Sequence, residues 1–274
     1  MARLTGKVAI VTGAGRGVGK ATALLLAREG AHVVVNDLDV DEAAATVNEI
    51  ILSGHSALVC AGSVTDPLFP DQLMQAALNA YGQIDILINN AGYIWNGAMH
   101  NHSDEQWQAM LDIHVTAPFK ILKSFSTWLR QQAKKEIAET GRAVCRKIVN
   151  VSSVSGTNGS ATQIAYSSGK AAVIGLTKTL AKEWGRYNVT VNCVAFGHID
   201  TRLTQPYTEE PPSIRVDDKD LKVGLSEAMV QSVTQMAPLG RVGQPEDGAG
   251  AIYLFCIPES DFITGEVLTC SGGA

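Results

Sequence analysis

The chain has 274 residues, of which 46% are hydrophobic, and its formal net charge is −5. This length and hydrophobic content suffice for one large domain over residues 1–274, and the acidic balance argues against a nucleic-acid partner. Five widely spaced cysteines without a Cys-x-x-Cys pair predict reduced thiols in a cytoplasmic protein, and neither a signal peptide nor a membrane-spanning apolar run is expected.

Short apolar, β-branched runs alternate with helical stretches along the chain. The runs are continuous rather than alternating in polarity, which is typical of parallel strands covered on both faces. The alternation therefore predicts an α/β fold with a parallel sheet and helices on both sides. Seven strands are predicted, at Lys7–Thr12, His32–Asp37, Ala57–Ala61, Asp85–Asn89, Lys147–Ser152, Thr190–Ala195 and Glu266–Cys270.

The first predicted strand runs into the glycine-rich stretch TGAGRGVG, residues Thr12–Gly19. A bare loop between a strand and a helix N-terminus leaves backbone N–H groups and the positive end of the helix dipole open to a phosphate. The stretch matches Gly-x-x-x-Gly-x-Gly through Gly13, Gly17 and Gly19, with Gly15 between them, rather than the strict Gly-x-Gly-x-x-Gly. It indicates a dinucleotide site, although a merely tight strand–helix turn is the alternative.

The second predicted strand ends in Asp37, eighteen residues after Gly19. A carboxylate there can accept hydrogen bonds from an adenosine ribose, and it would repel a 2′-phosphate, which favours NAD over NADP. Arg16 can offset part of this repulsion, so NADP is not excluded. The same two features occur in methyltransferases that use S-adenosylmethionine, so the rest of the chain must separate the two classes.

Helix capping and two long segments complete the predicted elements. Asp39-x-x-Glu42 and Ser103-x-x-Gln106 predict capping boxes at two helix starts. The charges of Thr127–Lys147 indicate a solvated helix end and a loop. The segment Thr201–Pro238 is expected to cover the substrate, and SIRVDDKDLKVGL within it predicts a β-hairpin followed by a helix from about Ser226.

Three residues point to acid–base chemistry. Tyr166 and Lys170 are four apart on a predicted helix and therefore share one face. A cation beside a phenol lowers the phenol pKa, which would suit Tyr166 to proton transfer near neutral pH. Ser153 ends the fifth predicted strand, and its hydroxyl can hydrogen-bond a carbonyl or an alkoxide. Tyr-x-x-x-Lys pairs occur by chance in many helices. A chance pair is less plausible here, because the glycine loop, Asp37 and Ser153 precede it in the order that such a site requires.

Four motifs stand along the chain in this order: Thr12-Gly13-x-x-x-Gly17-x-Gly19, Asn89-Asn90-Ala91-Gly92, Ser153 and Tyr166-x-x-x-Lys170. In these motifs the sequence resembles the short-chain dehydrogenase/reductase family over essentially the whole chain, and it is similar to the family's 3-oxoacyl thioester reductases. The resemblance implies a single-domain Rossmann fold with a doubly wound, seven-stranded parallel sheet. It also implies a nicotinamide cofactor, NAD or NADP, and a homotetramer or homodimer.

The resemblance assigns a role to each matching residue. Tyr166 would be the general acid/base, Lys170 would bind the nicotinamide ribose, and Ser153 would orient the reacting oxygen. Ser153, Tyr166 and His198, which follows the sixth strand, are expected to contact the substrate. The implied cofactor-binding residues are Gly13, Gly15, Arg16, Gly17, Val18, Gly19, Asp37, Ser63, Val64, Asn90, Ala91, Gly92, Tyr166, Lys170, Ile199 and Thr201.

The sequence departs from the family pattern at a few positions. His114 stands where many members carry an Asn that serves a proton relay, so it either keeps the relay as a catalytic residue or packs the helix. Ser63 replaces the usual acidic residue near the adenine, where the backbone of Val64 could still serve. No metal site is expected, because the pair His100-x-His102 has no further ligand at suitable spacing.

The expected reaction is hydride transfer between a nicotinamide cofactor and a carbonyl or secondary alcohol, foremost that of a 3-oxoacyl thioester reductase or 3-hydroxyacyl dehydrogenase. A dehydrogenase of a steroid, sugar or cyclic alcohol is the second hypothesis, and a cofactor-binding sensor is the third. The intact Ser153, Tyr166 and Lys170 argue against a sensor and a methyltransferase. Five basic residues either form a landing surface for an acidic carrier protein near the cleft or are ordinary solvated charges. They are Arg130, Lys134, Lys135, Arg142 and Arg146.

Overall fold

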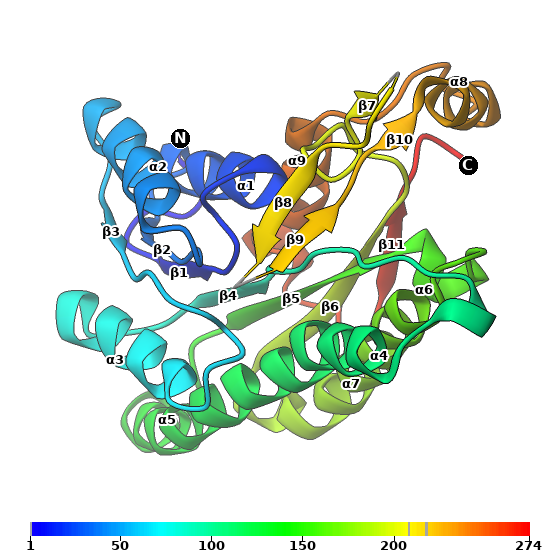
Figure 1. Cartoon of the computed structure of the whole chain (residues 1–274). Coiled ribbons are helices and arrows are strands. Elements are labelled where there is room, and N and C mark those ends of the chain that lie inside the picture. The colour runs from blue at the N-terminus through cyan, green and yellow to red at the C-terminus, as the bar shows by residue number, and fades with distance from the viewer. Residues whose placement is uncertain (1, 208, 217–218) are drawn as a thin grey trace.

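The computed structural model describes residues 2–207, 209–216 and 219–274. Seven parallel strands form the central sheet in the order β11-β6-β5-β4-β1-β2-β3 (Figure 1). The predicted doubly wound, seven-stranded sheet is confirmed, and each strand end lies within two residues of its expected position. The strands are β1 (Val8–Val11), β2 (His32–Val35), β3 (Ala57–Val59), β4 (Ile86–Asn89), β5 (Arg146–Ser153), β6 (Val189–Phe196) and β11 (Val267–Cys270).

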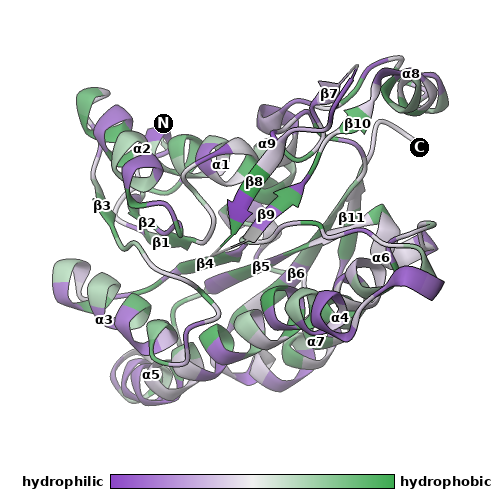
Figure 2. Cartoon of the chain, in the orientation of Figure 1, coloured by the Kyte–Doolittle hydropathy of each residue, from purple (hydrophilic) through white to green (hydrophobic). Residues whose placement is uncertain are grey.

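Helices cover both faces of the sheet (Figure 1). Successive strand residues face opposite sides: Ala9 and Val11 enter one apolar cluster, and Val8 and Ile10 enter the other. Because both faces are buried, most of the strands carry continuous apolar runs, and strands β1 and β2 are coloured as hydrophobic in Figure 2. One face is covered by α1 (Gly17–Arg28), α2 (Val40–Leu52) and α9 (Pro245–Leu254), and the other by α3 (Phe69–Tyr81), α5 (Ala117–Thr140) and α7 (Ile164–Trp184).

The strand order reverses beside β1, which pairs with β2 on one side and with β4 on the other. Val11 stands opposite both Val35 and Ile88 in these two ladders, so the carboxyl ends of three strands meet there. A reversal of this kind opens a crevice at the carboxyl edge of the sheet, where α/β proteins bind their ligands. The glycine loop leaves β1 at this edge.

The remaining helices are short. Ser103 forms the predicted capping box with Gln106. Asp39 also caps its helix, but Glu42 pairs with Arg16 rather than completing the second predicted box, so that prediction is half right. The short helices of the chain, besides the sheet-covering ones, are η1 (Met99–Asn101), α4 (Asp104–Leu111), the π-helical turn η2 (Asp112–Thr116), α6 (Val154–Asn158), η3 (Gly185–Tyr187) and η4 (Pro258–Ser260).

The segment between β6 and α9 projects over the carboxyl edge of the sheet (Figure 1). The predicted hairpin is confirmed as antiparallel β8 and β9, and its predicted polar turn at 217–218 lies outside the described residues. The predicted helix begins after its cap Ser226. The elements are β7 (Pro206–Tyr207), β8 (Ser213–Val216), β9 (Lys219–Lys222), β10 (Leu225–Ser226) and α8 (Glu227–Met236).

The prediction for Thr127–Lys147 is partly wrong. Helix α5 continues to Thr140, and Arg146 is buried, with its guanidinium 3.0 Å from the Glu136 carboxylate. The exposed basic residues of this segment also do not border the cleft, because the end of α5 leads into the amino end of β5, at the opposite edge of the sheet. A carrier-binding surface beside the cleft is therefore not formed by these residues. Among the described residues, no helix is long and apolar enough to cross a membrane.

Candidate active site

A cavity of about 1280 Å³ lies at the carboxyl edge of the sheet, beneath the segment that projects from β6. It brings together nearly all predicted site residues, from both halves of the chain. Gly15 does not line it, but its N–H donates to the Asp37 carboxylate at 2.9 Å. The predicted residues on its walls are Gly13, Arg16, Gly17, Val18, Gly19, Asp37, Ser63, Val64, Asn90, Ala91, Gly92, His114, Ser153, Tyr166, Lys170, His198, Ile199 and Thr201.

The glycine loop ends in a helix start without a side-chain cap. Arg16 occupies the cap position but makes no capping hydrogen bond, and no acidic residue lies in the first turn of α1. The N–H groups of this turn are therefore open to an anion. Gly19 allows the tight return of the loop, because a Cβ there would stand 2.0 Å from the carbonyl oxygen of Gly13.

Thr12 and Asn90 fix the loop to the end of β4. The Thr12 hydroxyl accepts the N–H groups of Asn90 and Ala91 at 3.0 and 3.1 Å. The Asn90 side chain donates to the carbonyl oxygens of Thr12 and Gly13 at 2.9 and 3.0 Å. Asn90 thus shapes the cavity wall through its side chain. Thr12 belongs to the glycine-rich motif identified from the sequence, but its role in fixing the loop was not predicted, because its partners lie 78 and 79 positions away.

Asp37 stands just beyond β2 with its carboxylate held by the backbone. One oxygen accepts the Gly15 N–H at 2.9 Å, and the other accepts the Asp39 N–H at 3.1 Å. Each oxygen keeps a lone pair for a further donor such as a hydroxyl. Arg16 turns to Asp39 and Glu42, with 2.8 Å to each carboxylate. The Arg16 charge is therefore balanced by two carboxylates.

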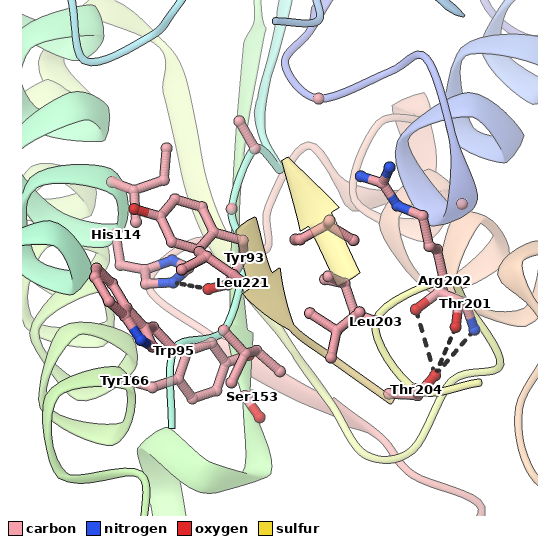
Figure 3. Close-up of a pocket in the computed structure, with 18 of the residues that line it drawn as sticks. Tyr93, Trp95, His114, Ser153, Tyr166, Thr201, Arg202, Leu203, Thr204 and Leu221 are labelled. Carbon is pink, nitrogen blue, oxygen red and sulfur yellow. Dashed lines mark hydrogen bonds between the residues drawn. The ribbon is translucent and has the colours of Figure 1, made fainter. Parts of the chain in front are cut away.

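Ser153, Tyr166 and Lys170 meet at one end of the cavity. Ser153 ends β5, and Tyr166 lies beside it in the first turn of α7 (Figure 3). One turn further on, the Lys170 ammonium donates to the carbonyl oxygen of Val151 at 2.8 Å, and the Ser152 hydroxyl donates to the carbonyl oxygen of Lys170 at 2.7 Å. These bonds fix α7 against β5 and hold the three side chains in place.

The expected effect of Lys170 on Tyr166 is not what the structure shows. Burial raises the pKa of Tyr166 to about 12, and the hydrogen bond with Ser153 only partly opposes this rise. The Lys170 ammonium lies 5.8 Å from the centre of the phenol ring, and burial lowers the pKa of Lys170 to about 8. Desolvation is the largest cause of both shifts, so at neutral pH the Tyr166 phenol is protonated while Lys170, with a pKa of about 8, still carries its positive charge.

His114 lies in the π-helical turn η2 and is 3% exposed. Its Nε2 is 2.8 Å from the carbonyl oxygen of Tyr93, and since a carbonyl only accepts, Nε2 carries the proton. Nδ1 is buried without a partner among the described residues. The ring meets that of Tyr166 edge-on, with centroids 5.0 Å apart, and approaches Gly92 so closely that a Cβ there would lie 2.5 Å from Cε1.

Burial lowers the pKa of His114 well below its usual value, and the charge of Lys170 adds to this effect. The imidazole is therefore neutral, with a donor committed to Tyr93 and an acceptor at Nδ1. His198 is partly buried on the cavity wall, where burial also lowers its pKa although Asp200 opposes the shift. Neither histidine has the neighbours of a metal ligand, because the described residues hold no cluster of three ligating side chains.

One wall of the cavity is apolar. Leu221, Ile214 and Val223 of the hairpin region are buried in a small cluster of their own. They pack against Tyr93 and Trp95, which follow β4, and Leu221 faces these rings in Figure 3. Sequence reasoning found the hairpin but not this contact, because the alternating residues of β8 and β9 do not reveal which surface they cover.

The donor set fits a nicotinamide dinucleotide. The open N–H groups of α1 suit a diphosphate, and Asp37 suits a ribose hydroxyl. Ser63 and Val64 line the cavity beyond Asp37, and Ile199 and Thr201 line it on the side of β6, so a long ligand has contacts at both ends. Such a cofactor supplies or accepts a hydride.

A family model for short chain dehydrogenases matches residues 7–212. The chain is 39% identical to a 3-oxoacyl acyl-carrier-protein reductase of Synechocystis sp., covering 100% of this chain and 98% of that protein. It is 35% identical to the hydroxy(phenyl)methylsuccinyl-CoA dehydrogenase subunit BbsD of Thauera aromatica, covering 97% of this chain and 96% of that one.

Two solved structures are also similar. The complex of a 7α-hydroxysteroid dehydrogenase with NADH and 7-oxo glycochenodeoxycholic acid superposes with a TM-score of 0.84 at 29% identity, covering 99% of this chain and 95% of that chain. A short chain dehydrogenase of Burkholderia cenocepacia in complex with NADP gives 0.81 at 28% identity, covering 99% and 98%. Fold, site geometry and relatives agree: this chain belongs to the short chain dehydrogenase family and is an NAD(P)-dependent oxidoreductase acting on a carbonyl or the corresponding alcohol.

Proposed function

We propose that the chain reduces 3-oxoacyl thioesters with NADH, or in reverse oxidises 3-hydroxyacyl thioesters with NAD. The observation that carries this proposal is the meeting of Ser153, Tyr166 and Lys170 in one cavity with the open end of α1. The thioester is supported by the relatives in Synechocystis and Thauera, whose names give an acyl-carrier-protein thioester and a coenzyme A thioester.

Tyr166 is the proposed proton donor in the reducing direction. A pKa of about 12 keeps its phenol protonated at neutral pH, which is the form a general acid needs. The Ser153 hydroxyl, which lies beside it, would donate to the same carbonyl oxygen as negative charge develops there. Lys170 would hold the nicotinamide ribose and provide the positive charge that favours the phenolate after proton transfer.

His114 is proposed as a neutral member of the site. Its Nε2 fixes the backbone of Tyr93, and its bare Nδ1 can accept a hydrogen bond from a water that continues to Lys170. In this way a histidine can keep a proton relay without changing its own charge. His198, on the wall near β6, is proposed to contact the substrate together with Ser153 and Tyr166.

The cofactor preference is proposed from Asp37. Its carboxylate accepts ribose hydroxyls, whereas a 2′-phosphate would meet its negative charge, and Arg16 is already paired with Asp39 and Glu42. NADP remains the second candidate. The proposed contacts are Gly13, Gly15, Arg16, Gly17, Val18, Gly19, Asp37, Ser63, Val64, Asn90, Ala91, Gly92, Tyr166, Lys170, Ile199 and Thr201.

A dehydrogenase of a steroid or another bulky secondary alcohol is the second candidate function. It is favoured by the apolar wall of Tyr93, Trp95 and Leu221 and by the similar structure that holds a steroid. We further propose that the chain is one domain in which residues 201–238 cover the substrate, and that it acts as a homodimer or homotetramer. The five unpaired cysteines favour a cytoplasmic location.

The test measures consumption of NADH and of NADPH by the purified protein on addition of a short 3-oxoacyl thioester. Wild type should turn over with NADH. The variant Tyr166→Phe lacks only the hydroxyl that donates the proton, so its kcat should fall by about 10²–10⁴-fold. Tyr187→Phe, in the distant turn η3, is the matched control and should keep full activity. Turnover only with NADPH would contradict the argument from Asp37. No turnover despite cofactor binding would contradict the thioester and direct the assay to secondary alcohols with NAD.

A further inference from the structure

The projecting segment begins with a tightly fixed turn, Thr201–Thr204. The Thr204 hydroxyl accepts the Thr201 N–H at 3.0 Å and donates to the carbonyl oxygen of Ile199 at 2.5 Å. The backbone N–H of Thr204 closes the turn by donating to the carbonyl oxygen of Thr201 at 2.9 Å. Figure 3 shows these bonds around Thr204. The turn therefore presents the intervening Arg202 in a defined direction.

That direction is toward the glycine loop. The methyl carbon of Thr201 lies 3.4 Å from the place where a Cβ on Gly17 would stand, so the turn touches the first residue of α1. In Figure 3 the Arg202 side chain extends from the turn toward this loop. Arg202 also lines the large cavity. Two segments that are far apart in the sequence thus face each other across the groove at the end of β1.

Arg202 differs from Arg16 in its charge balance. Arg16 has a carboxylate on each side at 2.8 Å. Arg202 makes no ion pair within 4 Å among the described residues and feels Asp37, Asp39 and Glu42 only at longer range. Burial lowers its pKa, and repulsion from Arg16 adds to the shift. Arg202 is exposed at the open cavity, so its guanidinium is solvated, has no ion-pair partner among the described residues, and is available to an anion bound at the uncapped start of α1.

We propose that Arg202 binds the diphosphate of the dinucleotide from the side opposite the first turn of α1, and that it thereby ties the segment 201–238 to the bound cofactor. This rests on the proposed function only in that a nicotinamide dinucleotide occupies the groove. The substrate-covering segment is then secured when the cofactor arrives. The sequence alone did not single out Arg202, since nothing in the local pattern shows that the turn reaches the glycine loop.

The test compares wild type with Arg202→Gln and Arg202→Lys by calorimetric titration of ADP-ribose, adenosine, NADH and NADPH. The Gln variant should bind ADP-ribose and NADH about tenfold or more weakly, since a charge-assisted hydrogen bond is lost. The Lys variant should recover part of the loss, and adenosine, which has no phosphate, should bind all forms equally. Arg186→Gln is the control, because Arg186 stacks on Tyr187 in η3 and does not line the cavity.

The second readout is hydrogen exchange of the amides in residues 201–207. ADP-ribose should slow their exchange in wild type and in Arg186→Gln but not in Arg202→Gln. Equal protection in Arg202→Gln would overturn the tether. Dissociation constants for ADP-ribose within twofold of wild type would overturn the diphosphate contact, as would a loss confined to NADPH, which would place Arg202 at the 2′-phosphate. An equal loss for adenosine would also overturn it, because packing and not charge would then be responsible.

None of these measurements requires turnover, so the two proposals fail separately. A wild-type protein that binds ADP-ribose but reduces no thioester contradicts the proposed substrate while the comparison of Arg202 variants still decides the contact. A protein that reduces thioesters with unchanged kinetics and unchanged binding in Arg202→Gln contradicts only the role of Arg202.

Discussion

The imidazole of His114 touches both the loop after β4 and the phenol of Tyr166, so its protonation state matters to the reaction. Its pKa lies well below 6.5, because the side chain is buried and Lys170 is near. We predict that kcat/KM for reduction shows no inflection from His114 between about pH 6 and pH 8. An inflection is expected near pH 8 instead, where the pKa of Lys170 lies and the ammonium is lost as the pH rises.

The measurement is the pH profile of kcat/KM in wild type and in His114→Asn, which keeps a donor and an acceptor in a shorter side chain. The two profiles should have the same shape even if their heights differ. A wild-type inflection near pH 6.5 that disappears in His114→Asn would show that the histidine titrates and would contradict the neutral relay. The sequence therefore predicted where His114 lies but not its charge, because the charge depends on the burial of the side chain in the folded protein.

At the scale of elements, α5 and β5 are joined by a buried ion pair that the sequence did not indicate. Glu136 and Arg146 lie ten positions apart, and their side chains are 12% and 2% exposed. Although burial alone would raise the pKa of Glu136, hydrogen bonds from Arg146 and from the Val144 N–H lower it to about 2. In sequence both residues look like solvated charges, because only the packing of α5 on the sheet removes them from water.

We predict that Glu136→Gln lowers the free energy of unfolding by about 3 kcal/mol at pH 7, because it leaves the Arg146 charge buried without its counter-ion. The carboxylate pKa is depressed in the fold, so the pair contributes its stability above about pH 4.5 and loses it as the pH falls toward 2. Urea unfolding of wild type and variant at pH 7 and pH 3 measures this. Glu139→Gln, exposed on the same helix, should match wild type. An equal stability difference at both pH values would contradict the assignment.

The elements that sequence reasoning described well are those with a local cause. Continuous apolar runs mark strands buried on both faces, and the hairpin at 213–222 follows from alternating residues in both arms. The contacts it missed are long-range. Thr12 meets Asn90, and Leu221 meets Tyr93 and Trp95, only because the sheet order places β1 beside β4 and the hairpin above both. The raised pKa of Tyr166 belongs to the same class, since desolvation depends on the assembled cavity.

At the scale of the whole molecule, the sheet leaves β11 as an edge strand, preceded by an exposed apolar pair. Phe262 is fully exposed and Ile263 is 41% exposed, and both lie just before β11. An apolar side chain beside an open strand edge is a common site of contact between identical subunits. The proposed homodimer or homotetramer would bury this corner of the molecule.

We predict that wild type has the mass of two or four chains by light scattering and that Phe262→Asp shifts the population toward smaller species at the same concentration. The introduced carboxylate would have to be desolvated in the contact, which opposes association. Leu52→Asp is the matched control, because Leu52 is 88% exposed at the end of α2, away from β11. Its mass should equal that of wild type. A monomeric wild type would contradict the oligomer, and a Phe262→Asp protein of unchanged mass would move the contact to another face.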